Sequence, residues 1–286
     1  MYSYKDYNEQ KYETGFWNIN RSKYKWFQNY TKLKIFTKWI KSSKGKSVFL
    51  DAGGGVGNWA FHFLKDFKKC IVLDISEKAL SLIPEKEIVK IHGSVLKIPL
   101  ENNSVDCILL ADVFEHIYEK DLPKMMRELT RVLRRNGRII IFTSEYGYGI
   151  DLLLNKLLFQ MKGRLTPADI ECGHVNRLTL EEKRIIFAQA GLKISDYYDY
   201  SILFQQLTDF IKDSSAKIIG FLFAKNKIEK SGQFIKDKFK THKEPSPIIR
   251  ALLYIPTLIS YLDIRLGKFI RGSSVFLLLE KNDNKT

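Results

Sequence analysis

Short apolar runs alternate with amphipathic stretches through the middle of this 286-residue chain. The stretches between the runs have apolar residues at helical spacing and predict helices. The runs themselves predict strands near residues 48–52, 70–74, 87–92, 105–110 and 138–143. Such alternation predicts a parallel sheet with helices on both faces, with the first strand near its middle and ligands at the carboxyl ends of the strands.

The pattern continues with a helix and two more strands. Thr179 is a suitable N-cap for a helix over residues 179–190, and Gly191 would end it. Residues 192–200 then predict a sixth strand, and the fully apolar run 274–280 predicts a seventh.

A glycine-rich turn follows the first predicted strand, where residues 51–57 read D-A-G-G-G-V-G. Glycine lets the backbone approach a ligand closely, and Asp74, at the end of the second strand, could accept hydrogen bonds from ribose hydroxyls. A dinucleotide fingerprint would have its third glycine where Asn58 stands. The carboxylate of Asp51 would repel a pyrophosphate but attract an ammonium group. The turn therefore favours a ligand with a ribose and an ammonium group but no phosphate.

This run and the motifs after it resemble class I S-adenosylmethionine-dependent methyltransferases over about residues 48–200. The further motifs are the loop 93–100, the strand and loop 104–116, and the helix, turn and strand 128–143, where Gly137 is expected to be a left-handed helix C-cap. The resemblance implies an α/β fold: a doubly wound, Rossmann-like sheet of seven strands with the last antiparallel. It also implies S-adenosylmethionine as cofactor.

The resemblance also assigns cofactor contacts. Many relatives have Asp where this chain has Ser94, and a hydroxyl accepts from the adenine amino group more weakly than a carboxylate. Asp51, Gly53 and Gly55 are assigned to the methionine part of the cofactor, and Asp74 is assigned to the ribose. Ile75, Ser94 and Val95 are assigned to the adenine, and the carbonyl of Ala111 is assigned to the ammonium group.

Candidate catalytic residues stand where loops follow the fourth and fifth strands. A base is needed only if the methyl acceptor must lose a proton. His116, Glu145 and Tyr146 are candidates from these loops, although a structural role for His116 stays open. His174 lies in a G-H-x-x-R-x-T run that is similar to one bordering the acceptor site of small-molecule methyltransferases. Arg177 in the same run would be an anion clamp or a loop tether.

Charge divides the chain, whose net charge is +15, into three parts. Residues 1–47 carry 11 Lys/Arg against 3 Asp/Glu and are expected to form an aromatic, basic helical segment. Residues 48–204 carry 21 against 21 and, with 274–286, would form the methyltransferase core. Residues 205–273 carry 13 against 6 and would be a basic, apolar helical insert between strands six and seven. The excess suggests an anionic partner surface, or simply a lysine-rich solvated exterior.

Each of the two basic segments permits more than one interpretation. Residues 25–40 have helical apolar spacing, and the aromatic N-terminal segment would either form a lid that holds the sulfonium by cation–π attraction or pack on the core. The insert would cap the active site, pack on the core as a helical subdomain or lie on an anionic membrane surface. Its longest apolar run is interrupted by Pro256 and is too short to span a bilayer.

The cysteines and the N-terminus indicate the cellular compartment. Cys70, Cys107 and Cys172 are odd in number and widely spaced, which indicates buried or incidental thiols in a reducing compartment and no metal site. The N-terminus shows no apolar leader segment. We therefore expect a cytoplasmic protein, with a peripheral membrane position as the alternative.

The leading hypothesis is methyl transfer to a small-molecule, lipid or glycan-precursor acceptor. The chain has no Asn-Pro-Pro-Tyr or Asp-Pro-Pro-Tyr run, which lowers the case for nucleic-acid or glutamine substrates. An RNA methyltransferase whose basic segments bind phosphates, and a non-catalytic scaffold that binds the cofactor, stay open. A nicotinamide-dependent dehydrogenase is least favoured, because the third glycine is missing.

Overall fold

The computed structural model describes residues 27–43, 46–146, 163–200 and 272–282, together with Leu258, Leu262 and Ile264. Residues 1–26 of the predicted N-terminal segment 1–47, with its possible lid, and nearly all of the predicted insert 205–273 lie outside the described residues. The division into three parts therefore stays a prediction.

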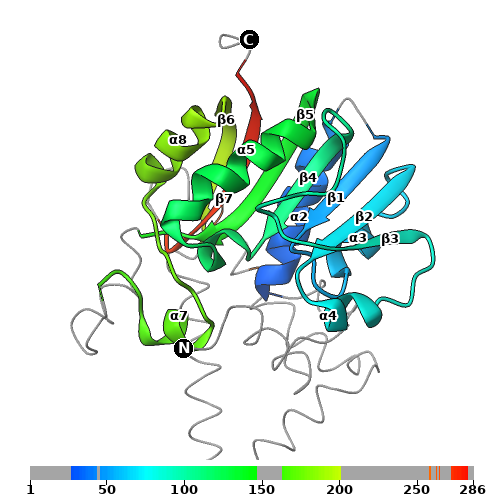
Figure 1. Cartoon of the computed structure of the whole chain (residues 1–286). Coiled ribbons are helices and arrows are strands. Elements are labelled where there is room, and N and C mark those ends of the chain that lie inside the picture. Colours follow the sequence, from blue (N-terminus) through cyan, green and yellow to red (C-terminus); the bar gives the residue numbers. More distant parts are fainter. Residues whose placement is uncertain are drawn as a thin grey trace, which may run out of the picture.

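The described strands form one seven-stranded sheet in the order β3-β2-β1-β4-β5-β7-β6 (Figure 1). Their bounds are β1 Val48–Ala52, β2 Lys69–Asp74, β3 Ile88–His92, β4 Val105–Ala111, β5 Leu133–Ser144, β6 Leu192–Tyr200 and β7 Ser274–Lys281. Strand β7 is antiparallel to both β5 and β6, and the other neighbours are parallel. The predicted sheet, with its antiparallel seventh strand, is confirmed.

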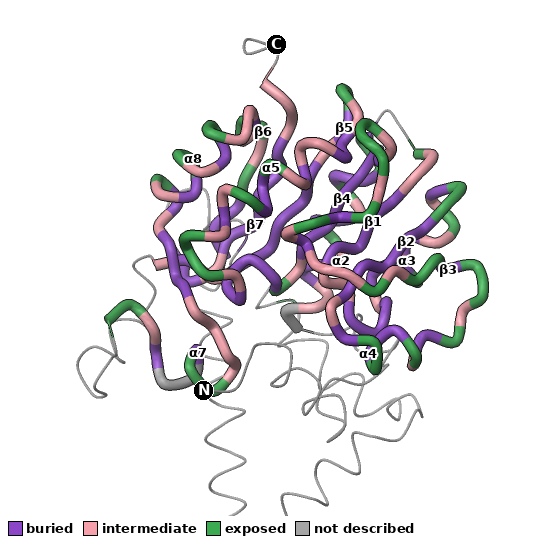
Figure 2. Tube along the Cα trace, in the orientation of Figure 1, coloured by how far each residue is buried: buried purple, intermediate pink, exposed green. Residues whose placement is uncertain are grey.

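Helices cover both faces of the sheet, and the strands are buried between them (Figures 1 and 2). On one face, α5 (Leu122–Val132) and α8 (Leu180–Gln189) pack onto strand residues such as Leu50. On the other, α2 (Phe27–Lys41), α3 (Asn58–His62) and α4 (Glu77–Ser81) pack onto residues such as Phe49. Neighbouring residues of β1 thus serve opposite cores, as the alternation of side chains along a strand requires.

Helix α8 begins and ends where the sequence predicts. Thr179 accepts from the backbone of Glu182, whose side chain accepts in return from the Thr179 backbone, which makes a capping box. Gly191 follows the helix with a φ of 75°, in the left-handed region that a helix C-terminus favours.

The predicted role of Gly137 is wrong. Helix α5 ends at Val132, β5 begins at the next residue, and Gly137 lies inside that strand without a positive φ. The register between β4 and β5 shifts there, so the chain bulges. A Cβ on Gly137 would lie 2.9 Å from the backbone oxygen of Asp106. Glycine is needed for this close approach of two backbones, and not for a helix cap.

Helix α2 packs its aromatic side chains against the sheet. Phe36 meets Trp59 edge-on, with ring centroids 4.9 Å apart, and Trp39 stacks on Tyr198 at 5.8 Å. Trp39 is therefore a core residue, as the alternative to a lid predicted. The lid itself stays a prediction for residues 1–26.

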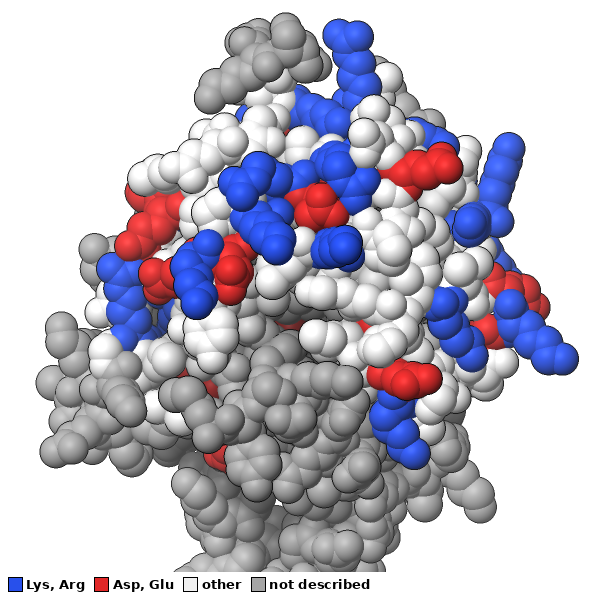
Figure 3. All heavy atoms as spheres, in the orientation of Figure 1, with Lys and Arg blue, Asp and Glu red and all other residues white. Residues whose placement is uncertain are grey.

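The charged surface of the core is mixed in sign. On the face covered by α5 and α8, Lys and Arg side chains lie among Asp and Glu side chains (Figure 3). Arg131 pairs with Glu128, and Arg164 pairs with Glu182. No helix in the described ranges is both long and apolar enough to cross a bilayer.

The cysteines are free thiols, and two of them are buried as predicted. Burial raises the pKa of Cys70 and of Cys107 to about 12. Cys172 is half-buried.

Candidate active site

A glycine loop, residues 53–57, connects the end of β1 to α3. Gly53, Gly55 and Gly57 all have positive φ values, of 73°, 54° and 68°. The amide of Gly53 donates to the carbonyl of Leu73 at 2.7 Å, and the amide of Gly55 donates to Asp74 Oδ2 at 2.7 Å. The loop is therefore folded over the end of β2.

The loop has no room for side chains at two of its positions. A Cβ on Gly53 would lie 2.6 Å from a methyl group of Val113, and one on Gly54 would lie 2.5 Å from the carboxyl carbon of Asp51. The bare backbone of this loop therefore packs against the loop after β4 on one side and against a β1 carboxylate on the other.

Two carboxylates hold the loop in shape. Asp51 is 1% exposed, and its Oδ2 accepts from the amide of Ala60 near the start of α3. Asp74 is 9% exposed and accepts from the amides of Gly55 and Ser76. Burial raises the pKa of Asp74, while these backbone hydrogen bonds oppose the rise. The backbone cradle and its flanking acids fit a ligand with a ribose and an ammonium group.

The residues predicted to edge an adenine lie around the ends of β2 and β3. The amide of Gly93 donates to the backbone oxygen of Asp74 at 2.9 Å, and the ring of His92 donates to the backbone oxygen of Ile75 at 3.0 Å. Ser94 Oγ accepts from the amide of Leu96 at 3.1 Å. Ile75 and Ser94 are half-buried and Val95 is buried, and their contact with an adenine stays a prediction.

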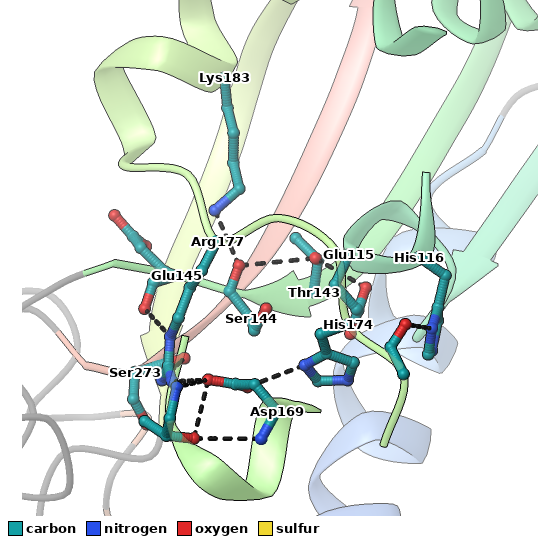
Figure 4. Close-up of polar contacts among 12 residues, drawn as sticks. Glu115, His116, Thr143, Ser144, Glu145, Asp169, His174, Arg177, Lys183 and Ser273 are labelled. Atoms are coloured by element: carbon teal, nitrogen blue, oxygen red, sulfur yellow. Dashed lines mark hydrogen bonds and ion pairs between the residues drawn. The ribbon is translucent and has the colours of Figure 1, made fainter. Parts of the chain in front are cut away.

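On the other side of the loop, His174 forms an ion-pair network with two neighbours (Figure 4). His174 Nδ1 donates to Asp169 Oδ1 at 2.8 Å, and Arg177 Nη1 donates to Asp169 Oδ2 at 2.7 Å. Burial alone would raise the pKa of Asp169, but the His174 and Arg177 partners hold it well below its usual range. Burial would likewise lower the pKa of His174, and the hydrogen bond to Asp169 raises it above its ordinary value.

The predicted candidates His116 and His174 lie together. Their ring centroids are 4.9 Å apart, with the planes nearly perpendicular. His116 Nδ1 donates to the backbone oxygen of Gly173 at 3.1 Å, and burial lowers the pKa of His116. Asn176 ties the same segment to the loop after β4 by donating to the backbone oxygens of Phe114 and Ile117.

Glu145 and Tyr146 lie directly after β5, as predicted. Glu145 is fully buried, and its Oε1 accepts from the amide of Leu180 at the start of α8. Tyr146 is half-buried, and the guanidinium of Arg164 lies 5.2 Å from its ring centroid. The hydrogen bond from Leu180 ties Glu145 to the start of α8, and a role for either residue toward an acceptor stays a prediction.

Arg177 is a loop tether, which is one of its two predicted roles. It is 5% exposed, and besides Asp169 it donates to the backbone oxygens of Glu145 and Ser273. It thus ties together the ends of α7 (Pro167–Glu171), β5 and the start of β7. Lys183 is buried beside it and donates to the backbone oxygens of Ser144 and Leu178. Burial lowers the pKa of Lys183 to about 8.

Sequence reasoning missed the polar partners of this network. Asp169 lies only five positions before His174 and eight before Arg177, but no motif in the sequence links the three side chains. Glu115, whose Oε2 accepts from Thr143 Oγ1, stands directly before His116 and has no motif of its own. Lys32 could have been found, since it stands one turn before Ile35 and Phe36 in the buried stripe of α2. Its Nζ donates to Asp112 Oδ2 at 2.6 Å.

Comparison with known proteins identifies the class. Residues 50–141 match the family described as a methyltransferase domain. The chain is 25% identical over 163 residues to an uncharacterized methyltransferase, YcgJ, of Bacillus subtilis, a match covering 54% of this chain and 61% of that protein. It is 26% identical over 175 residues to a candidate S-adenosylmethionine-dependent methyltransferase of Mycolicibacterium smegmatis, covering 60% of each. The chain spans about half the length of the curated relatives it matches.

Solved structures show the same fold. A candidate sarcosine dimethylglycine methyltransferase from Galdieria sulphuraria superposes with a TM-score of 0.55 at 16% identity, covering 96% of this chain and 98% of that one. Geranyl diphosphate C-methyltransferase from Streptomyces coelicolor gives a TM-score of 0.51 at 12% identity, covering 87% and 79%. Residues 50–141 therefore match a methyltransferase domain, and the sheet order is the one expected of the class I S-adenosylmethionine-dependent methyltransferase fold.

Proposed function

We propose that the protein transfers a methyl group from S-adenosylmethionine to a small-molecule acceptor. The observation that carries this proposal is the hydrogen bond from the Gly55 amide to Asp74, which joins the glycine loop to the acid at the end of β2. The hydrogen bond holds the Asp74 carboxylate where a ribose would lie. Residues 50–141 of the same chain match a methyltransferase family.

The cofactor, when bound, supplies an electrophilic methyl group on a sulfonium. The chain then has to hold the acceptor in line with that methyl group, and such positioning can account for most of the catalysis. Asp51 and Asp74 hold the glycine loop in shape, and the carbonyl of Ala111 would accept from the ammonium group.

We assign the role of general base to His174. Because its Nδ1 donates to Asp169, a neutral His174 would have its basic lone pair on Nε2. A carboxylate that orients a histidine in this way fixes the tautomer and the direction of the ring. His116 lies against the His174 ring and would help to orient it. Glu145 and Tyr146 would then line the acceptor side of the site without taking a proton.

The acceptor class is inferred from chemistry and from named relatives. The Galdieria and Streptomyces neighbours are named for sarcosine or dimethylglycine and for geranyl diphosphate, which are small molecules. For this chain, the apolar, basic composition of residues 205–273 favours a lipid or glycan precursor with an anionic group. An anionic membrane surface would then be the place where the protein meets such an acceptor.

Calorimetric titration of the purified protein tests the proposal directly. We expect S-adenosylmethionine and S-adenosylhomocysteine to bind at micromolar concentration and NADH not to bind. Absence of binding to both sulfur ligands, in protein shown to be free of co-purified ligand, would overturn the proposal.

A second experiment separates the acceptor classes. The protein is incubated with methyl-labelled S-adenosylmethionine and one of three pools: polar metabolites, extracted lipid and quinone precursors, or RNA. Label in the lipid or polar pool supports the proposal. Label in RNA, with binding that weakens steeply as salt rises, would instead support the RNA methyltransferase alternative.

A further inference from the structure

Lys32 is a buried cation at the carboxyl edge of the sheet. Its side chain is only 4% exposed, and it belongs to helix α2, which packs on the sheet face opposite α5 and α8. Its Nζ lies 2.6 Å from Asp112 Oδ2 and 4.0 Å from the centroid of the Phe142 ring. Burying an ammonium group is costly unless it is paired, so the ion pair and the ring together explain why the charge is tolerated.

Asp112 forms an unusual turn directly after β4. Its φ is 59°, in the left-handed region that side chains other than glycine, asparagine and aspartate rarely adopt. Its amide donates to the backbone oxygen of Phe142 at 3.0 Å. The carboxylate paired with Lys32 is 48% exposed, so it also faces out of the protein at this edge.

This turn lies between the two halves of the site. Ala111, the residue before Asp112, has the carbonyl assigned to the ammonium group of the cofactor. Val113, the residue after it, occupies the space that a side chain on Gly53 would need. The charge of Asp112 also acts on both His116 and His174. A shift of this turn would therefore move a predicted cofactor contact and the packing of the glycine loop together.

We propose that Lys32 is a positioning residue for the amino-acid portion of the cofactor. Through its ion pair with Asp112 it holds the turn 111–113, and with it the carbonyl of Ala111, in the shape that receives the ammonium group. This inference rests on the proposed function. It adds that helix α2, which lies within the N-terminal segment 1–47, is coupled to cofactor binding through one buried charge.

The test compares two ligands that differ only in the portion concerned. S-adenosylhomocysteine carries the ammonium and carboxylate groups, whereas 5′-methylthioadenosine lacks them but keeps the ribose and adenine. In Lys32→Met, which removes the charge and keeps most of the stem, we expect S-adenosylhomocysteine to bind about tenfold more weakly. Binding of 5′-methylthioadenosine should stay within about twofold of wild type.

Equal weakening of both ligands would indicate general damage to the fold and would overturn the proposal. Unchanged or tighter binding of S-adenosylhomocysteine would also overturn it, because Lys32 would then only neutralise Asp112. Lys32→Arg, which keeps the cation, should retain the wild-type preference for S-adenosylhomocysteine over 5′-methylthioadenosine.

Asp112→Asn gives an independent arm if Lys32→Met does not fold. Asparagine tolerates a left-handed backbone, so this change removes the charge of a half-exposed side chain without new strain. We expect the same selective loss of S-adenosylhomocysteine binding, and a double variant no worse than either single one. Additive losses, or no loss in Asp112→Asn, would reject the coupling. If the wild-type protein itself binds neither ligand, the proposed function fails instead.

Discussion

The two sides of the candidate site are built in different ways. On the cofactor side, the glycine loop is held by backbone amides and by the carboxylates of Asp51 and Asp74, all from the single unit of β1, α3 and β2. On the acceptor side, Asp169, His174 and Arg177 form a local side-chain network, and Arg177 connects it to distant segments at Glu145, after β5, and at Ser273, before β7. The first side is a local motif that many ligands could share. The second depends on separate segments meeting, and this is where the specificity of one enzyme can reside.

The largest expected effect tests the cofactor side alone. Asp74→Ala would remove two charge-assisted hydrogen bonds to the ribose, each of about 1.5–3 kcal/mol, and would release the amide of Gly55. We expect binding of S-adenosylhomocysteine to weaken by about a hundredfold or more, measured by calorimetry. Unchanged affinity would show that Asp74 does not hold the ribose.

Next in size is a change on the acceptor side. His174→Gln removes the proposed base, and we expect kcat for an acceptor that must lose a proton to fall by about 10²–10⁴-fold. The affinity for S-adenosylhomocysteine should not change. His116→Gln is the matched comparison, and a larger loss of kcat in that variant would transfer the role of base to His116.

The pH profile gives a further readout of the same group. Because Asp169 raises the pKa of His174, the active neutral form should appear only above the ordinary histidine pKa, so kcat should rise with pH through that region. A flat profile in wild type would argue against His174 as the base.

Removing the tether should affect stability rather than cofactor binding. Arg177→Met leaves Asp169 buried without its guanidinium partner, and we expect the free energy of unfolding to fall by about 3–5 kcal/mol. Arg184→Met is the control, because its pair with Glu181 is exposed and 3.7 Å long, and it should cost less than about 1 kcal/mol. Denaturant titration of both variants measures the difference. Similar losses would mean that the acceptor-side network adds no special stability.

The smallest effect compares helix caps on the two sides. Thr179→Ala breaks the capping box of α8, and Ser76→Ala removes the N-cap of α4, so each should cost about 1 kcal/mol of stability. Thr179→Ala should in addition lower kcat, because α8 begins beside the tether Arg177. If Ser76→Ala lowered kcat equally at saturating cofactor, the two sides would not be independent.

The sequence predicted the cofactor side well because its signals are local. The apolar runs located the strand ends to within one residue, except that β5 begins at Leu133, five residues before its predicted start. The glycine turn with Asp74 showed where the chain folds back on itself. Gly137 was misread because helix caps and close backbone contacts both use glycine. Only the approach of Asp106 from another strand distinguishes the two.

The amino-acid sequence by itself determined the α/β class, the order of the elements and the identity of the cofactor motif, since periodicity and turn chemistry act over a few residues. The tertiary structure alone decided which polar side chains meet. Arg177 binds the backbone oxygens of Glu145 and Ser273, which are 32 and 96 positions away, and Lys32 pairs with Asp112, 80 positions away along the chain. Such pairs form only after the sheet has brought distant segments to one edge, and burial there makes each unpaired charge costly.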